Sequence, residues 1–154
     1  MIQPEFFDTV NYALCRAVDD FLGDRAEEFF RRMGEYHLEE AAAKGLLGLR
    51  DDDAPLDALV RIARYLEASG YMEKIEIARL SDREAVVEMH GVTVTASSTK
   101  LLREGRRPSH FMTNLMFAAL RKRSVRAELR DMEYDERERR FKEYWKILEA
   151  GSGS

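Results

Sequence analysis

The three histidines of this chain are the side chains best suited to metal or proton chemistry. His37 follows Met33 at helical spacing, on the apolar face of a predicted helix. It could be a haem or metal ligand, but we favour a hydrogen-bonded, partly buried histidine. His90 alternates with Glu88 on one face of a predicted strand. Because a metal site needs three or four converging ligands and two are visible here, we predict no metal site.

The third histidine, His110, follows Ser109. A Ser–His pair is not catalytic without an orienting acid and an oxyanion hole, so capping of the next helix is the better interpretation of Ser109. The lone Cys15 excludes an intrachain disulfide and lies beside an apolar stripe, which is typical of a small core residue. No convergent set of catalytic groups is evident, so an enzyme is the least favoured class.

Two basic segments could meet to hold a phosphate or an acidic partner, although a solvated charged rim is the favoured alternative. They comprise Lys100, Arg103, Arg106 and Arg107, and then Arg121, Lys122, Arg123 and Arg126. No aromatic residues are interleaved with them for base stacking, and the net charge of −4 gives no overall attraction to nucleic acid. We therefore expect no nucleic-acid partner.

Residues 108–122, PSHFMTNLMFAALRK, separate the two basic segments and are apolar on nearly every side. A helix of this kind is usually buried all round. The side chains expected to line a pocket for an apolar or aromatic ligand are Phe111, Met112, Leu115, Met116 and, from the last strand, Trp145. The alternative is that they form ordinary core, and in a pocket the polar Thr113 and Asn114 would orient the ligand.

Apolar spacing predicts three helices in the first half, over residues 4–22, 24–44 and 55–70. Asp24, three residues before Glu27, is expected to cap the second helix, and Gly45 to end it in a left-handed conformation. Pro55 suits the first turn of the third helix.

The second half changes to a two-residue period. Residues 71–79 and 85–89 predict a hairpin, and a one-residue slip at Gly91 predicts a β-bulge before 92–96. Next we expect a helical turn or loop over 97–107, followed by the apolar helix. Two further strands are predicted over 125–129 and 141–148, joined by a turn at 134–137. The predicted fold is α+β: N-terminal helices, then β-β-α-β-β, with one antiparallel sheet packed on helices.

At 154 residues, 45% hydrophobic and 35% charged, the chain is expected to form one domain over residues 1–150. Residues 151–154, GSGS, have the composition of a flexible linker and suggest an engineered chain. No apolar run approaches the roughly 18 residues of a membrane span, and no signal peptide is evident, so we predict a cytoplasmic protein with no membrane partner.

This order of elements resembles the vinyl-reductase-like ("hydrocarbon-binding") domain family, which is related to the haem-nitric-oxide-binding domains. The resemblance is carried by FLGDRAEEFFRRMGEYHLEEAAAKG, by LDALVRIARYLEASGYMEKIEI and by the strand pair, apolar helix and strand pair over 71–148. It implies the fold, a tendency to dimerise and an apolar pocket. The internal helix and MEYDERERRFKEYW lack the cysteines of many relatives, and no tyrosine-serine-arginine haem motif is present, so we expect no metal or other cofactor.

Our first hypothesis is therefore a non-enzymatic, homodimeric domain that binds an apolar or aromatic small molecule. The alternative is an engineered or structural subunit whose role is homo-oligomerisation. The small residues of 41–43, followed by Gly45, Leu46 and Leu47, would give it a flat apolar patch with exposed leucines.

Overall fold

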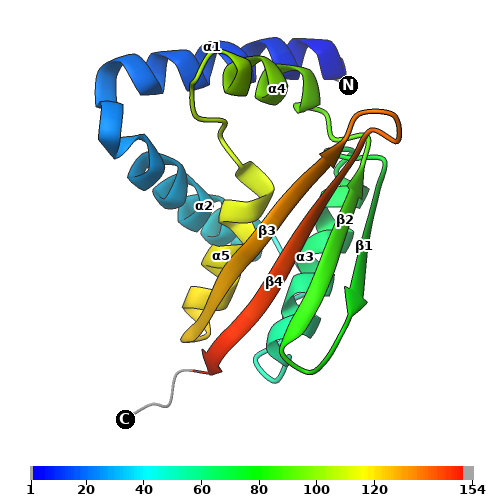
Figure 1. Cartoon of the computed structure of the whole chain (residues 1–154). Helices are drawn as coiled ribbons and strands as arrows, with labels where there is room; N and C mark the ends of the chain where they lie inside the picture. The colour runs from blue at the N-terminus through cyan, green and yellow to red at the C-terminus, as the bar shows by residue number, and fades with distance from the viewer. Residues whose placement is uncertain (1, 151–154) are drawn as a thin grey trace.

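The computed structural model describes residues 2–150, so the predicted GSGS linker lies outside the described residues (Figure 1). The helices and strands form the α+β fold predicted from the sequence, with N-terminal helices and one four-stranded antiparallel sheet packed on helices. The helices are α1 (Pro4–Leu22), α2 (Ala26–Ala43), α3 (Pro55–Ala68), α4 (Thr95–Arg103) and α5 (Phe111–Lys122). The strands are β1 (Lys74–Arg79), β2 (Glu84–His90), β3 (Val125–Asp135) and β4 (Arg140–Ala150).

The sheet has the order β1-β2-β4-β3, so β4 is inserted between the two strands that precede it in the chain. Alternation directs Ala85, Val87 and Met89 of β2 inward, in register with the inward side chains of β4. An irregularity between Leu129 and Asp131 of β3 shifts the pairing. Because a shift of one residue reverses the face of a strand, the irregularity keeps apolar side chains directed inward along its whole length.

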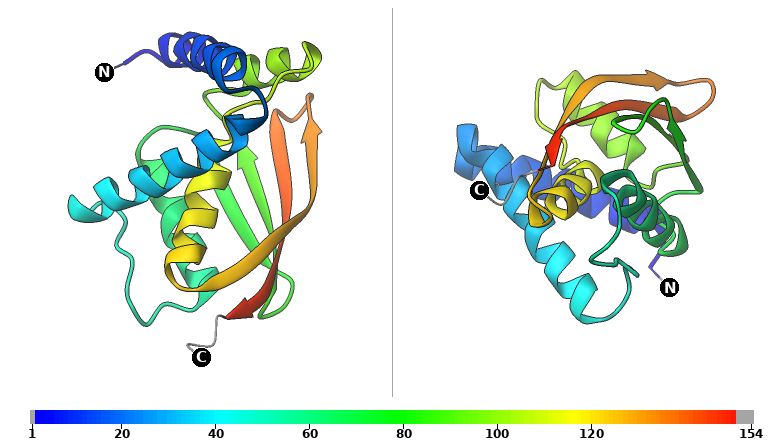
Figure 2. Two further views of the ribbon diagram at one scale, coloured as in Figure 1. Left: turned by 90° about the vertical axis from the view of Figure 1, so that its left-hand side faces the viewer. Right: turned by 90° about the horizontal axis from the view of Figure 1, so that it is seen from below.

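Helices cover one face of the sheet and one end of it (Figures 1 and 2). Helix α5 lies between α2 and the sheet, and α3 packs on α5 and β1. Residues 111–120 include no exposed side chain, but Phe111, Thr113, Asn114 and Phe117 are only partly buried, so the apolar helix is buried on most sides and not all round. Helices α1 and α4 lie side by side across the end of the sheet. The other face carries the polar side chains of the strands.

Helix α2 approaches α5 closely at Gly34. A Cβ atom at Gly34 would lie 2.7 Å from the carbonyl oxygen of Asn114, nearer than real Cβ atoms come to such an oxygen. The absence of a side chain at this position therefore sets how deeply α5 sits between α2 and the sheet.

Two predicted caps and one predicted strand are wrong. Asp24 lies in a short 3-10 turn, Gly23–Arg25, and makes no capping hydrogen bond to α2. His110, with a left-handed φ of 49°, occupies the N-cap of α5, so Ser109 does not cap it. Gly91, with φ of 61°, ends β2, and the expected bulge and continuing strand are replaced by a turn and α4. The left-handed stop at Gly45 is confirmed by its φ of 69°.

Ser109 instead joins a buried polar network between α1, α4 and the start of α5. Its hydroxyl donates to Asn11 Oδ1 at 2.9 Å, and Asn11 Nδ2 donates to Ser97 Oγ at 2.8 Å. All three side chains are buried. Because each polar group has a partner, the network joins the N-terminal layer to α5 without an unsatisfied group at these contacts.

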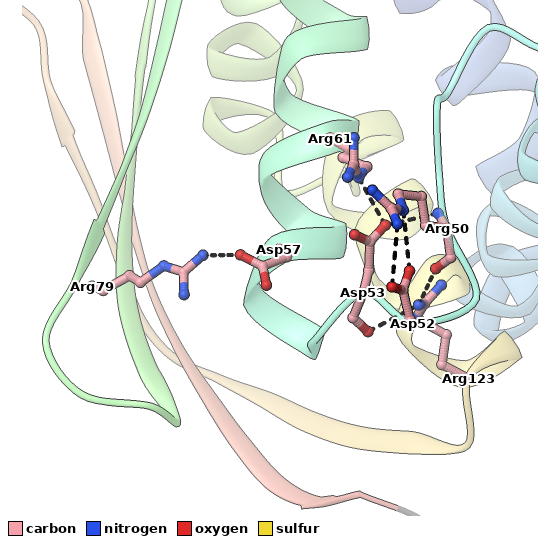
Figure 3. Close-up of polar contacts among 7 residues, drawn as sticks. All are labelled: Arg50, Asp52, Asp53, Asp57, Arg61, Arg79 and Arg123. Atoms are coloured by element: carbon pink, nitrogen blue, oxygen red, sulfur yellow. Dashed lines mark hydrogen bonds and ion pairs between the residues drawn. The ribbon is translucent and has the colours of Figure 1, made fainter.

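Arginine contacts hold the loop between α2 and α3 in place (Figure 3). Arg61 Nε donates to Asp53 Oδ2 at 2.8 Å, and the backbone N–H of Arg50 donates to the same oxygen, also at 2.8 Å. Arg123, which follows α5, donates to the carbonyl oxygens of Arg50 and Asp53. The hydrogen bond from Arg61 lowers the pKa of Asp53, because it favours the ionised carboxylate. The predicted second basic segment therefore includes a structural arginine.

The patch proposed around Leu46 and Leu47 is not the surface we expected. Leu46 is 53% exposed, but Leu47 is 4% exposed and belongs to the main core cluster, so there is no pair of exposed leucines. Among the described residues, no helix is both long and apolar enough to cross a membrane.

Candidate functional site

A cavity with a volume of about 750 Å³ lies between α2, the segment before α5, α5 itself and strands β3 and β4. This value is within the range of about 300–1,000 Å³ typical of small-molecule sites. Apolar side chains form much of its wall, among them Phe30, Phe117, Val125, Ala127 and Leu129. We call it the Glu143 cavity, after the one buried acidic side chain that borders it.

Glu143 is 1% exposed although it is a carboxylic acid. It lies in the centre of β4, on the inward face shared with Phe141, Trp145 and Ile147. Thr113 Oγ1 donates to Glu143 Oε2 at 2.8 Å, and Trp145 Nε1 donates to Glu143 Oε1 at 3.4 Å. Among residues 2–148, no basic side chain lies within 4.0 Å of this carboxyl group, so it is hydrogen-bonded but has no ion pair.

Burial raises the pKa of Glu143 from 4.5 to about 7, and the hydrogen bonds from Thr113 and Trp145 only partly oppose this rise. The cause is desolvation, which disfavours the ionised form. Near neutral pH the carboxyl group can therefore either bind a proton or accept a cation. Such a shifted acid at the edge of a large cavity is typical of a functional site.

Arginines from both basic segments line this cavity. Arg106 and Arg107 come from the first segment, and Arg121 and Arg126 from the second, so part of each segment does meet in space as considered above. Three of them have acidic partners. Arg106 pairs with Asp19 and Asp20, Arg107 with Asp24 at 3.6 Å, and Arg121 with Glu35 at 3.5 Å.

The five predicted ligand-lining residues are divided among different environments. Leu115, Met116 and Trp145 lie in the main core cluster, and Trp145 packs against Phe117 with ring centroids 4.5 Å apart. Met112 and Phe111 border a small internal cavity of about 70 Å³, which also contacts Glu143 and Thr113. The Glu143 cavity itself is lined by the other side of α5, through Thr113, Asn114 and Phe117.

A second cavity, of about 240 Å³, lies between α1, α2, α3 and α5 and is lined by Phe7, Phe111 and His37, among others. The His37 Nε2 atom is 2.8 Å from the Tyr65 hydroxyl oxygen. This contact confirms the prediction of a hydrogen-bonded, partly buried histidine. Burial lowers the pKa of His37, which favours the neutral ring. Cys15 is also confirmed as a buried residue with a free thiol.

His90 has one more potential metal-ligating neighbour than the sequence indicated. Donor atoms of Glu76, Glu88 and His90 lie within 4.8 Å of one another on the outer face of the sheet, because Glu76 pairs directly with Glu88 across β1 and β2. Lys142 already pairs with Glu88 at 3.2 Å, and Lys74 with Glu76 at 2.7 Å. These ammonium groups satisfy the carboxylates, so the cluster is accounted for as an ion-pair network.

Sequence reasoning missed Glu143, although the signal was present. The predicted last strand placed Phe141, Trp145 and Ile147 on one face, and the same two-residue period places Glu143 among them. A glutamate at an inward position is informative because burying a charge is costly unless it is paired or serves a function.

Neither a known family nor a curated protein matches this chain by sequence. Solved structures do show similarity. An Fe(II) unliganded H-NOX protein from K. algicida has a TM-score of 0.54 and 14% identity over 84% of this chain and 66% of that chain. An H-NOX structure described in a study of heme distortion has a TM-score of 0.53 and 9% identity, over 88% of this chain and 69% of that chain.

A mutant Tt H-NOX gives a TM-score of 0.51 and 10% identity, with the same two coverages of 88% and 69%. At this identity the likeness concerns the fold alone. The chain spans just under two thirds of the length of the K. algicida structures, 64% and 66%. Membership of the vinyl-reductase-like family stays a prediction.

The residues of this chain do not fit a haem. Haem binding needs an axial side chain that faces a cavity large enough for the macrocycle. The buried side chains of α3 are aliphatic, so they offer no axial ligand. The second cavity, which His37 lines, has a volume of about 240 Å³ and is smaller than ordinary small-molecule sites. His110 borders the larger cavity, but the Glu143 carboxyl group and the Asn114 amide also line that cavity, and these polar groups do not suit an apolar macrocycle. We therefore assign no haem to this protein.

Proposed function

We propose that this chain is a non-enzymatic small-molecule-binding domain that holds an apolar or aromatic ligand in the Glu143 cavity. The observation that carries the proposal is a cavity of about 750 Å³ whose wall is largely apolar and which is bordered by a single buried acid. Small-molecule sites typically combine an apolar wall with a few oriented polar groups. Here the polar groups are Glu143, Thr113 and Asn114.

Binding would be driven by burial of ligand apolar surface, at about 25 cal/mol per Å². Phe117 would transmit occupancy to the core, because it both lines the cavity and packs on Trp145. Trp145 is the only tryptophan of the chain, so its emission can report binding without a label.

The test is a titration with N-phenyl-1-naphthylamine, a neutral aromatic probe, in wild type and in two matched variants. Ala127 lines the cavity, whereas Ala78 is exposed on β1. Ala127→Phe places a phenyl ring inside the cavity and should weaken probe binding at least tenfold, whereas Ala78→Phe adds the same side chain elsewhere and should leave probe binding unchanged. Equal binding by wild type and Ala127→Phe would exclude this cavity as the site.

A second candidate function, self-association, is favoured by the outer faces of α1 and α2. Phe21 is 89% exposed and Tyr36 is 62% exposed. Tyr36, Leu22, Phe29 and Met33 line a groove of about 500 Å³ together with the charged Arg25, Glu28 and Arg32. Apolar side chains grouped in this way are typical of interfaces, so we propose that a second copy of the chain packs here to form a homodimer.

Analytical ultracentrifugation tests the second proposal. Phe21→Glu should convert a dimer to a monomer, whereas Leu80→Glu, at an exposed leucine on the β1–β2 turn, should not. A wild-type mass equal to one chain at high concentration would reject the dimer.

A further inference from the structure

The part of the Glu143 cavity at Thr113 and Asn114 presents several hydrogen-bond acceptors. The Thr113 hydroxyl donates to Glu143, and Asn114 Nδ2 donates one of its two N–H groups to the carbonyl oxygen of Ser109 at 3.0 Å. The acceptors at this end are the carboxyl oxygens of Glu143 and the amide oxygen of Asn114. An ionised carboxylate offers about four acceptor positions, and two are occupied.

We infer that the ligand of this cavity is an organic amine, with its protonated amino group at Glu143 and its apolar or aromatic body along Phe117, Ala127 and Leu129. This inference rests on the proposed function and names the class of ligand. An ammonium group supplies hydrogen-bond donors and no acceptor, which complements the acceptors at this end. It also supplies the positive charge that the buried carboxyl group lacks among residues 2–148.

Three of the five arginines that line the cavity do not require an anionic ligand, because Arg106, Arg107 and Arg121 contact aspartates or Glu35. Arg31 and Arg126 also line it, and neither makes an ion pair among residues 2–148, so an anionic ligand is the competing outcome that the carboxylate probe tests. Glu143 is the buried charge at the cavity that has no such compensation. A buried carboxylate gains most from a cation, because the surrounding low dielectric strengthens their attraction.

Amine binding should depend on pH through Glu143, because the ammonium ion pairs with the carboxylate and not with the neutral acid. His110 borders the same cavity, and Tyr71 contacts the adjoining small cavity. The charged side chains that also line the cavity are Glu27, Arg31, Arg106, Arg107, Arg121 and Arg126. Burial, with the nearby Cys15 and Glu143, raises the pKa of Tyr71, so the phenol stays neutral. Desolvation lowers the pKa of His110, so the imidazole is neutral at pH 8 and does not compete for the carboxylate.

The experiment compares three ligands of nearly the same shape by isothermal titration calorimetry. They are the amine 2-(1-naphthyl)ethylamine, the alcohol 2-(1-naphthyl)ethanol and the carboxylate 1-naphthaleneacetate. At pH 8 we expect the amine to bind wild type at least tenfold more tightly than the alcohol, and this preference to decrease at pH 6. Glu143→Gln should remove the preference and still bind the alcohol. Glu136→Gln, at an exposed glutamate in the β3–β4 turn, should keep it.

Any result other than a preference of wild type for the amine overturns the inference. Tightest binding of the carboxylate would show that the arginines select the ligand, and equal binding of amine and alcohol would show that Glu143 does not. If none of the three binds while N-phenyl-1-naphthylamine still does, the amine inference fails and the proposed function stands. If that neutral probe also fails to bind, both are rejected.

Discussion

Replacing Glu143 by glutamine should change the stability of the protein in a way that depends on pH. The folded-state pKa of Glu143 is raised from 4.5 to about 7, whereas the unfolded chain loses this proton near the ordinary value. The folded state therefore binds the proton more tightly, and its stabilisation is present below pH 4.5 and is lost as the pH rises through 7. At about 1.4 kcal/mol for each pKa unit, the loss amounts to about 3 kcal/mol.

Glutamine has nearly the same shape and does not titrate, so it should not suffer this loss. Only one terminal atom of glutamine, Oε1, accepts hydrogen bonds, so one of the bonds from Thr113 and Trp145 is lost, which costs about 1 kcal/mol. We therefore expect Glu143→Gln to be about 2 kcal/mol more stable than wild type at pH 8 and about 1 kcal/mol less stable at pH 4.

Urea unfolding at both pH values, followed by circular dichroism, measures the two differences. Glu136→Gln controls for the change in net charge, because Glu136 is exposed. An equal free-energy difference between wild type and Glu143→Gln at pH 4 and pH 8 would refute the burial argument for Glu143.

Three further substitutions test the packing that supports the cavity. Gly34→Ala should lower the free energy of unfolding in urea titrations by about 1–3 kcal/mol, because its Cβ would meet the carbonyl oxygen of Asn114. If this variant is as stable as wild type, α2 and α5 separate easily. Asn11→Ala should cost about 1–3 kcal/mol by leaving two buried serine hydroxyls with one partner fewer, and a neutral result in the same assay would mean that water replaces the amide. Asp53→Asn should be less stable than wild type at pH 7, because Arg61 lowers the pKa of Asp53, and the difference should disappear as the pH falls below 3.8; a difference that persists at low pH would contradict this assignment.

The sequence was sufficient for the fold because its main signals are periodic. The spacing of apolar residues defined α1, α3 and α5, and alternation defined the two hairpins. It failed where local chemistry has more than one outcome. Gly91 could begin a bulge or end a strand, and its left-handed φ ends the strand. Ser109 could cap a helix or join a distant partner, and Asn11, 98 residues away, is that partner.

The candidate site was less accessible from sequence, because a cavity depends on which side of a buried helix meets the sheet. The apolar side of α5, with Leu115 and Met116, packs into the core, whereas Thr113 and Phe117 face the Glu143 cavity. In a helix that is apolar on nearly every side, the polar Thr113 and Asn114 were the sequence signal for this choice, and they do line the cavity. Glu143 could have been found from strand alternation, but its lack of a basic partner depends on residues distant in the chain.

Native mass spectrometry of freshly purified protein, followed by organic extraction of bound material, tests the central claim most directly. We expect wild type to carry a stoichiometric small molecule with an apolar body, and Ala127→Phe to carry none. A ligand-binding function for this cavity would be contradicted if the mass spectrum of wild-type protein shows no adduct and the protein has no affinity for the neutral aromatic probe.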